Sequence, residues 1–342
     1  MSIRQAIMRV TAGEHLTEAE MTAAMEEILG GGAETAAVAD LLRGLATKRE
    51  TVAELVSAAR VLRAHAVAVT GMPAHAIDTC GTGGDGHGTL NVSTAAGVVA
   101  AACGVPVAKH GNRAISGRVG GADVLEALGV RLELPPARLV ECLRATNFAF
   151  LFAPSLHPAI RHAGPARRQL KSRSMFNLLG PLANPAGVRR QVVGVFAPDW
   201  VVPMAEALLA LGAERAWVLH GAGGFDELAL RGESDVAEVA NGRVRTFRVD
   251  AAAAGLVAAD IDALRVESVA DAAACLRRIL AGERGPTRDV VCLNAAAALV
   301  VAEKATDLRA AAALAARALD DGAAAGVLDR VVRFTTDAGA DG

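Results

Sequence analysis

The sequence has 342 residues, which suits two domains of ordinary size and excludes a small module held together by disulfides. Thirty-five Lys and Arg face 37 Asp and Glu, so a formal net charge of -2 gives no overall field that would attract nucleic acid or an anionic membrane. The longest apolar run, residues 95–108, is interrupted by glycine and is shorter than the ~18 residues that a membrane span needs.

The N-terminal part of the chain predicts short amphipathic helices. Thr17 and Glu20 form a capping-box pattern at the start of an apolar stripe, and glycines end that helix at residues 30–32. Thr51 and Glu54 repeat the pattern. No strand pattern occurs in the first 65 residues, so we expect a small all-helical domain over residues 1–72.

From residue 76 onward, short apolar runs alternate with helical patterns. The runs lie at residues 76–78, 105–108, 148–152, 191–196 and 216–220, and Ala-rich helical segments follow at about 287–302 and 305–320. Strands that alternate with helices predict an α/β fold with a mostly parallel central sheet flanked by helices. We expect this larger domain over residues 73–342, with helices from about 165–190 joining the smaller domain. Ligands should bind at the carboxyl ends of the strands.

The glycine-rich segment at residues 78–94, DTCGTGGDGHGTLNVST, is the sharpest motif. Glycines that follow a strand let backbone N–H groups approach a phosphate. Gly81, Gly83 and Gly86 also fit the GxGxxG pattern of nicotinamide sites. Such a site needs an acidic residue about 20 residues later to hold the ribose. Residues 86–122 contain no Asp or Glu, so we interpret the motif as a phosphate loop instead.

Two further features next to this loop suit an anion. Asn91, Ser93 and Thr94 open a helix, which adds hydroxyl groups and the positive end of a helix dipole. A Gly-rich loop follows the next strand in the same acid-free segment, and its cations are Lys109, Arg113 and Arg118. A mobile basic surface loop would account for these cations equally well. Two such loops after strands of one sheet favour a shared polyphosphate site.

A second acid-free segment spans residues 142–198. Its cations are Arg144, Arg161, Arg167, Arg168, Lys171, Arg173, Arg189 and Arg190. This local positive field suits an anionic substrate or a nucleic-acid surface. Three of its five phenylalanines lie in the predicted buried strand at 148–152, so few aromatic rings remain to stack on bases.

Asp226 and Glu227 are adjacent carboxylates that follow a Gly-rich turn and the predicted strand at 216–220. Such pairs usually mark a solvated helix start. Carboxylate oxygens also suit Mg²⁺ bound jointly with substrate phosphates. With phosphate loops on the same sheet, we expect the pair to bind a metal.

These segments, in this order, resemble the anthranilate phosphoribosyltransferases, a family of nucleoside phosphorylase-like phosphoribosyltransferases. The resemblance reaches about residue 335 and rests on DTCGTGGDG, NVST, KHGNR, ADVLEALG, FNLLGPLANP and the HG…DE pair. It implies Mg²⁺-dependent transfer of a phosphoribosyl group from 5-phosphoribosyl 1-pyrophosphate (PRPP) to the amine of anthranilate, in tryptophan biosynthesis. It also implies a cleft between the two domains, a homodimer formed through the helical domain, and no nucleic-acid or membrane partner.

The resemblance assigns residues to each ligand. The PRPP residues are Gly81, Gly84, Asp85, Thr89, Asn91, Val92, Ser93, Thr94, Lys109, Ser116, Gly117 and Gly121; the anthranilate residues are Gly81, His110, Asn112, His157 and Arg167. Ser93, Asp226 and Glu227 would hold Mg²⁺, and Lys109, Asp226 and Glu227 would act in catalysis. This chain departs from its relatives, which often have more serines in the loop, at Ala114, Gly117, Val119 and Gly121.

Because an aryl amine is a poor nucleophile, we expect pyrophosphate to depart ahead of attack, with inversion at C1 of the ribose. Two alternatives stay open: a pyrimidine nucleoside phosphorylase and a non-catalytic nucleic-acid-binding relative. The intact GTGGDG and GNR segments argue against the first, and the anthranilate and metal positions argue against the second. Five cysteines form no CxxC pair, and no signal peptide pattern is seen, so we expect reduced thiols in the cytoplasm.

Overall fold

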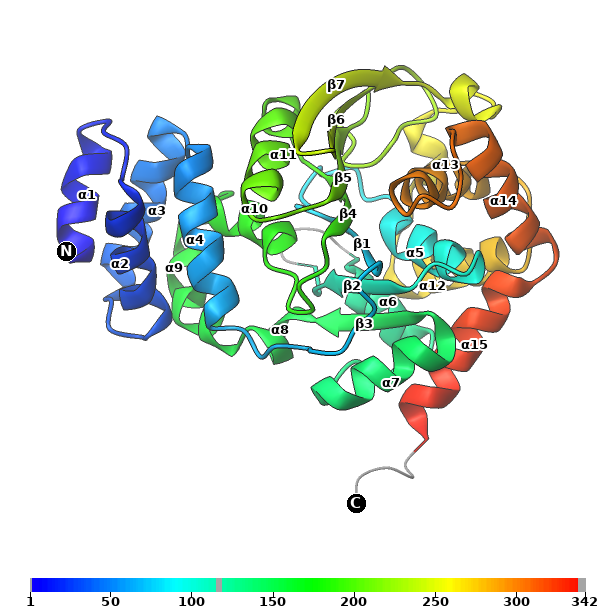
Figure 1. Ribbon diagram of the computed structural model, residues 1–342, viewed down its shortest axis with the longest axis horizontal. Coiled ribbons are helices and arrows are strands. Elements are labelled where there is room, and N and C mark those ends of the chain that lie inside the picture. Colours follow the sequence, from blue (N-terminus) through cyan, green and yellow to red (C-terminus); the bar gives the residue numbers. More distant parts are fainter. Residues whose placement is uncertain (1, 115–118, 338–342) are drawn as a thin grey trace.

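The computed structural model describes residues 2–114 and 119–337. A small group of helices lies at one end of the molecule and a larger α/β part at the other (Figure 1). The N-terminal helices are α1 (Ile3–Thr11), α2 (Glu18–Leu29), α3 (Thr35–Lys48) and α4 (Val52–Ala64). The predicted fold class, a small all-helical domain and a larger α/β domain, is confirmed.

The capping boxes that the sequence predicts start two of these helices. The Thr17 side chain accepts a hydrogen bond from the Glu20 N–H, and the Thr51 side chain accepts one from the Glu54 N–H. Glu54 is itself fully buried, where it pairs with Lys48 at 2.7 Å and accepts from the Leu16 N–H at 2.8 Å. A local start signal thus also ties α4 to the loop between α1 and α2.

The described residues form one seven-stranded sheet in the order β3-β2-β1-β4-β5-β6-β7. The strands are β1 (Ile77–Gly81), β2 (Val107–Gly111), β3 (Phe148–Phe152), β4 (Arg190–Gly194), β5 (Arg215–His220), β6 (Ser234–Ala240) and β7 (Arg243–Val249). Strands β3 to β5 in this order are mutually parallel, whereas β5, β6 and β7 pair antiparallel. The sheet is therefore mostly parallel, as predicted.

The sequence analysis missed the hairpin of β6 and β7. Its turn is Asn241-Gly242, and both residues have positive φ, 53° and 70°. An Asn-Gly turn between alternating residues is a strong hairpin signal, because its twist matches that of the flanking strands. The signal was present in the sequence.

Strand β2 also ends later than the predicted run at 105–108, because it continues to Gly111. Lys109 and His110 therefore lie within the sheet and not on the loop that follows it, which corrects the sequence interpretation. Both side chains are buried.

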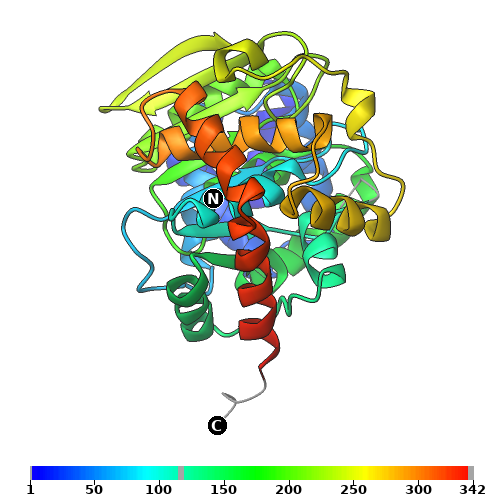
Figure 2. The same ribbon diagram turned by 90° about the vertical axis from the view of Figure 1, so that its right-hand side faces the viewer.

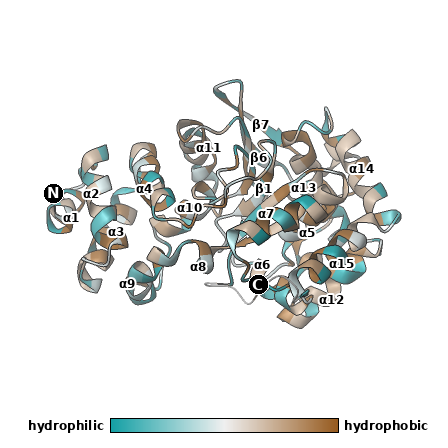
Figure 3. Cartoon of the chain, turned by 60° about the horizontal axis from the view of Figure 1, so that its bottom comes forward, coloured by the Kyte–Doolittle hydropathy of each residue, from teal (hydrophilic) through white to brown (hydrophobic). Residues whose placement is uncertain are grey.

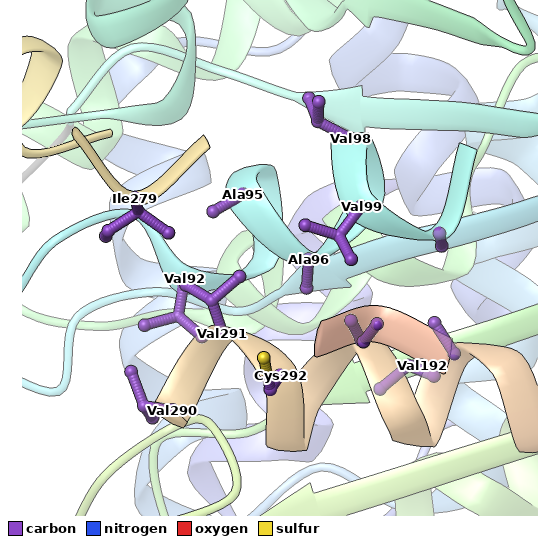
Figure 4. Close-up of a cluster of buried hydrophobic side chains, with 14 of the residues drawn as sticks. Val92, Ala95, Ala96, Val98, Val99, Val192, Ile279, Val290, Val291 and Cys292 are labelled. Carbon is purple, nitrogen blue, oxygen red and sulfur yellow. The ribbon is translucent and has the colours of Figure 1, made fainter. Parts of the chain in front are cut away.

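Helices cover both faces of the sheet. On one face, α5 (Val92–Ala102) packs on α13 (Pro286–Val301), and Figure 4 shows Val92 and Ala96 meeting Val291 and Cys292 between them. The C-terminal helices α14 (Leu308–Asp320) and α15 (Ala323–Thr336), orange and red in Figure 2, lie outside α13 and α5. On the other face, α11 (Val201–Ala210) packs on β5, β6 and α4.

Helices from the middle of the chain return to the N-terminal group. Among them, α9 (Gly164–Leu170) packs on α3, η1 (Pro158–Ala163) on α2, and α10 (Met175–Leu182) on α3 and α4. One hydrophobic cluster consequently runs from α1 through α10 to the sheet. The domain boundary at residue 72 stays a prediction.

The remaining elements complete the chain. They are α6 (Gly121–Ala127), α7 (Pro136–Thr146), α8 (Ala153–Leu156), η2 (Pro198–Trp200), η3 (Ala251–Ala254), η4 (Ile261–Leu264) and α12 (Val269–Leu280). Coloured by hydropathy, many helices show both hydrophilic and hydrophobic stretches (Figure 3). Within the described ranges, no helix is long and apolar enough to cross a membrane.

Candidate active site

The site residues gather where neighbouring parallel strands end. Strand β1 lies between β2 and β4, and β4 pairs with β5, so the segments that follow these strands leave the same edge of the sheet. The Gly-rich loop follows β1 at Gly81, and the Asp226–Glu227 pair follows β5. The topology therefore allows the convergence that the sequence analysis assumed.

Three of these segments meet at Lys109. Lys109 is 3% exposed, and its ammonium group donates to the Thr79 carbonyl and lies 3.3 Å from Ser93 Oγ. The Ser93 N–H in turn donates to Glu227 Oε1 at 2.9 Å. A cation from β2, the start of α5 and a carboxylate that follows β5 thus form one hydrogen-bonded cluster.

Two glycines at strand ends make room for Asp226. A Cβ at Gly194 would lie 1.6 Å from the Asp226 carbonyl oxygen, so only glycine fits there. A Cβ at Gly81 would lie 3.2 Å from the Gly194 carbonyl and 3.7 Å from Asp226 Oδ2. Asp226 and Glu227 belong to no helix, so the alternative of a solvated helix start is wrong.

The carboxylates of this cluster carry more negative charge than the protein balances. Burial, followed by the charges of Asp85 and Glu227, raises the pKa of Asp226 well above its ordinary value. Burial raises the pKa of Glu227 to about 7, although Lys109 and the Ser93 hydrogen bonds oppose the shift. A divalent cation would remove this repulsion.

The donor set fits Mg²⁺ shared with a ligand. Asp85, Asp226, Glu227 and the Ser93 hydroxyl supply oxygen atoms, which Mg²⁺ prefers. Among the described residues, no three His, Cys, Asp or Glu side chains form a ready-made metal cage. Mg²⁺ commonly binds through one or two carboxylates together with water and substrate phosphates, so a cage is not required.

The Gly-rich loop has the backbone that close approach to phosphate needs. Its glycines Gly83, Gly84, Gly86 and Gly88 all have positive φ, which other residues rarely adopt. The loop is held from outside, because Thr89 pairs antiparallel with Arg265.

The start of α5 faces the loop that follows β2. Asn91 Nδ2 donates to the Val119 carbonyl at 3.2 Å, while its buried Oδ1 has no hydrogen-bond partner among the described residues. A Cβ at Gly121 would lie 2.8 Å from Thr94 Oγ1, so these two residues are close. Asn91 Oδ1 is thus an acceptor available to a ligand hydroxyl.

One predicted PRPP residue, Val92, does not present its side chain to the site. Val92 is buried in the core beside Val291, and its N–H donates to the Leu90 carbonyl. Only the backbone of Val92 remains near the cluster. Ser116 and Gly117 lie outside the described residues, as does Arg118.

Two histidines form a separate, uncharged end of the site. The rings of His110 and His157 are both buried, with centroids 5.0 Å apart. Burial lowers the pKa of His110 to about 3 and that of His157 to about 4, the latter despite the nearby Ala183 carbonyl. His110 Nδ1 lies 3.2 Å from the Gly180 carbonyl, which can only accept, so Nδ1 carries the proton. His110 Nε2 then presents a lone pair with no protein partner among the described residues.

The other predicted anthranilate residues flank this end less directly. Arg167 on α9 lies over the Phe176 ring at 5.4 Å, and burial lowers the pKa of its guanidinium. Helix α10 carries both Phe176 and the Gly180 carbonyl that His110 contacts, so it connects Arg167 to the histidines. Asn112 is exposed, and its Oδ1 accepts from the Arg113 N–H at 2.7 Å.

Arg113 is not the free phosphate cation that its position suggested. Its guanidinium pairs with Asp123 at 3.0 Å and with Glu126 at 2.7 Å. Both carboxylates belong to α6, at the end of the acid-free segment. Arg113 therefore anchors the loop to α6.

Sequence reasoning missed two residues that shape the site. Asp78, fully buried in β1, accepts from the His110 N–H at 3.0 Å and from Asn184 Nδ2 at 2.9 Å. A carboxylate inside an apolar strand was the available signal, because unpaired charges are rarely buried. Arg173 donates to the Gly84 carbonyl and lies 4.5 Å from the Phe196 ring centre. In the sequence, Arg173 stands out only as one cation of the acid-free segment 142–198.

Comparisons with known proteins agree with this geometry. The description "Glycosyl transferase family, a/b domain" matches residues 73–325, and "Glycosyl transferase family, helical bundle domain" matches residues 4–66. Anthranilate phosphoribosyltransferase from Rhodopseudomonas palustris (strain BisB5) is 48% identical over 96% of this chain and 97% of its own length. The chain belongs to the anthranilate phosphoribosyltransferase family.

Solved structures of the family share the fold. The crystal structure of anthranilate phosphoribosyltransferase from Thermus thermophilus is 45% identical, with a TM-score of 0.91 over 96% of this chain and 99% of that chain. The enzyme from Saccharomyces cerevisiae, in complex with PRPP and Mg, is 22% identical, with a TM-score of 0.88 over 97% of each chain, and shows the fold alone. As a member of this family, the chain is an enzyme, a transferase of the tryptophan pathway.

Proposed function

We propose that this chain transfers the phosphoribosyl group of PRPP to the amine of anthranilate and releases pyrophosphate, giving N-(5-phosphoribosyl)anthranilate. The observation that carries the proposal is the Lys109–Ser93–Glu227 cluster. It lies at the edge of the sheet where β1 ends and the Gly-rich loop begins. Membership of the anthranilate phosphoribosyltransferase family supports both substrates.

PRPP binds, in this proposal, between the Gly-rich loop and the start of α5. Backbone N–H groups of the loop and the Lys109 ammonium bind the diphosphate, and Asn91 Oδ1 accepts from a ribose hydroxyl. Mg²⁺, present with PRPP in the S. cerevisiae complex, would be held by Ser93, Asp226 and Glu227. When bound, it supplies positive charge to the diphosphate oxygens.

Anthranilate binds at the histidine end. The Arg167 guanidinium offers a bidentate match to its carboxylate, and the S. cerevisiae enzyme has been solved with 4-fluoroanthranilate. His110 and His157 place uncharged rings beside the aromatic amine. Because these neutral rings carry no extra proton to give to the amine, the amine stays neutral and nucleophilic.

The residues act by position and charge. The bond from C1 to the diphosphate oxygen breaks, its electron pair leaves with pyrophosphate, and the amine nitrogen bonds to C1 from the opposite face. Lys109 and the loop N–H groups stabilise the charge that grows on pyrophosphate. Arg167 and the histidines align the amine with C1, and the amine then loses one proton.

A fluorescence assay of anthranilate consumption with PRPP, with and without Mg²⁺, tests the proposal. We expect turnover that needs both PRPP and Mg²⁺, and Asp226→Asn and Glu227→Gln should each raise the Mg²⁺ concentration needed for half-maximal rate. Asp329→Asn, at an exposed carboxylate on α15, is the matched control. Thymine release from thymidine and phosphate, or salt-dependent DNA binding without anthranilate consumption, would support the alternatives instead.

Two assignments belong to the same proposal. We infer a homodimer formed through the helical domain, which sedimentation of the purified chain at micromolar concentration tests. We also propose a cytoplasmic location, which the free cysteines among the described residues support.

A further inference from the structure

The segment that carries the carboxylate pair belongs to no helix or strand, yet the residues on both sides of the half-buried pair are buried. It runs from Phe225 to Ala229. Leu228, which directly follows the Asp226–Glu227 pair, is fully buried. Buried backbone N–H and C=O groups need partners, and no neighbouring strand supplies them here. Something else must hold this segment in place.

Asn294 supplies both partners for Leu228. Its Oδ1 accepts from the Leu228 N–H at 2.9 Å, and its Nδ2 donates to the Leu228 carbonyl at 3.1 Å. A third hydrogen bond, from Nδ2 to the Val290 carbonyl at 2.9 Å, fixes the amide on α13. The side chain therefore takes the place of a strand partner for one residue.

The surroundings of Asn294 make this contact specific. Residues 290–301 of α13 are all apolar except Asn294, which is 2% exposed. Its oxygen and both of its amide hydrogens are used by backbone groups, so the amide has one satisfied orientation. A polar residue inside an Ala-rich helix core costs stability unless it is paired in this way.

Further contacts hold the same segment on either side. Ser234 Oγ, fully buried at the start of β6, accepts from the Ala229 N–H at 3.0 Å. Before the pair, the Gly221 N–H donates to the Phe225 carbonyl at 2.7 Å. A Cβ at Gly221 would lie 2.3 Å from the Glu227 carbonyl oxygen, so the backbone has no space to move toward β5.

We propose that Asn294, assisted by Ser234, is a positioning residue for the Asp226–Glu227 pair, an inference that rests on the proposed function of that pair. Leu228 follows Glu227 directly, and Glu227 Oε1 must stay 2.9 Å from the Ser93 N–H. Loss of the amide leaves two buried backbone groups of Leu228 unpaired, so the segment rearranges to satisfy them. The carboxylates then lose their alignment with Ser93 and Lys109. Asn294 itself touches neither substrate nor metal.

The test measures metal binding apart from turnover. Mn²⁺ is used as a spectroscopic probe, and its binding in the presence of PRPP is measured by electron paramagnetic resonance for the wild type, Asn294→Ala and Asn294→Asp. Loss of an outer partner of a metal ligand commonly weakens metal affinity about 10- to 100-fold. We expect a loss of that size for Asn294→Ala, a similar rise in the Mg²⁺ concentration for half-maximal rate, and an anthranilate KM within about twofold of wild type. Asn294→Asp, which keeps an acceptor for the Leu228 N–H but loses both donors, should show a loss too.

Thr335→Val is the matched control. Thr335 lies on α15, is 4% exposed and, like Asn294, hydrogen-bonds two backbone groups. Its hydroxyl accepts from the Arg131 N–H and donates to the Val332 carbonyl. It should lower the melting temperature without changing Mn²⁺ affinity. If Asn294→Ala does not fold, Asn294→Asp and Ser234→Ala decide by the same measurement.

The outcomes separate the two levels of the proposal. Unchanged Mn²⁺ affinity in every folded variant at Asn294 and Ser234, with Asp226→Asn still defective, overturns the positioning role alone. Unchanged Mn²⁺ affinity in Asp226→Asn and Glu227→Gln overturns the proposed metal site itself.

Discussion

The two ends of the site differ in the groups that they bury: interacting carboxylates at one end and two imidazole rings at the other. At the carboxylate end, Asp85, Asp226 and Glu227 are close enough for their charges to interact, and the Lys109 charge acts on Glu227; burial raises the pKa of Asp226 and Glu227. At the histidine end, burial lowers the pKa of His110 and His157, so both rings are neutral. Burial favours the uncharged form at both ends.

The difference shows which end needs a ligand to complete it. Either protonation or a bound cation would reduce the repulsion between the carboxylates. A divalent cation shared with a diphosphate does this near neutral pH while the carboxylates keep the negative charge that binds the cation. The histidine end is already neutral and offers a free lone pair on His110 Nε2. The first end is suited to charge and the second to an aromatic amine.

Loss of Lys109 should have the largest effect. Lys109→Met removes the cation between the Thr79 carbonyl, Ser93 Oγ and the carboxylates. Removing one group that stabilises transition-state charge commonly lowers kcat about 10²- to 10³-fold, and we expect a loss of that size. Lys304→Met is the control and should retain the full rate. Lys304 is exposed and lies near Gly104, a residue that precedes β2. A variant at Lys109 with near-normal kcat would contradict the role of the carboxylate end.

Arg167→Ala should sharpen the contrast between the ends. It removes a charge-assisted partner of the anthranilate carboxylate, a bond worth about 1.5–3 kcal/mol, which corresponds to a rise of roughly 10- to 100-fold in the anthranilate KM. The KM for PRPP should stay close to that of wild type. Arg168→Ala, at the adjacent exposed arginine, is the control in steady-state assays. Equal rises in both KM values would show that Arg167 supports the whole cleft.

Acidification should weaken metal binding at the carboxylate end. Because the pKa of Glu227 is about 7, protons compete with the cation below that pH. We expect Mn²⁺ affinity, measured by calorimetry with pyrophosphate present, to fall by up to about tenfold per pH unit from pH 7 to pH 5.5. Glu227→Gln should bind more weakly at pH 8 and show a flatter profile. A wild-type profile that is flat in this range excludes Glu227 as a ligand.

At the histidine end, acidification should give a smaller effect, a loss in the free energy of unfolding. His157 has a folded pKa of about 4, below its ordinary value of 6.5, so the unfolded chain binds more protons in acid. Its contribution is complete above pH 6.5 and is lost as the pH falls, by about 1.4 kcal/mol at pH 5.5. His157→Phe should lose less stability than wild type between pH 7.5 and pH 5.5 in denaturant unfolding.

The exposed His75→Phe is the control for that measurement. Glu227 contributes in the other direction, because its raised pKa gives stability below pH 4.5 that is lost as the pH rises through about 7. If His157→Phe and wild type lose equal stability on acidification, the ring is not held neutral.

Local signals in the sequence predicted the parts of the fold that depend on neighbouring residues. Thr17 and Thr51 start helices because their hydroxyls accept from N–H groups three residues later, whatever the rest of the chain does. The alternation of strands and helices predicted a mostly parallel sheet for the same reason. Even so, the Asn241-Gly242 turn was overlooked, and β2 reached Gly111 because its length depends on pairing with β3.

Charge in the sequence predicted the site less well. Arg113 stood in an acid-free segment, yet its partners Asp123 and Glu126 lie just beyond that segment and reach back to it. Asp78 looked like one more motif residue, although it organises His110 from within β1.

The amino-acid sequence alone thus determined where helices begin, where the backbone can turn only with glycine, and which family the motifs resemble. Only the tertiary structure decided that Ser93 meets Glu227, a residue 134 positions away, and that Asn294 holds Leu228. The physical reason is that strand order sets which loops leave the same edge of the sheet. A side chain's burial and charge balance depend on those distant neighbours, which no local pattern specifies.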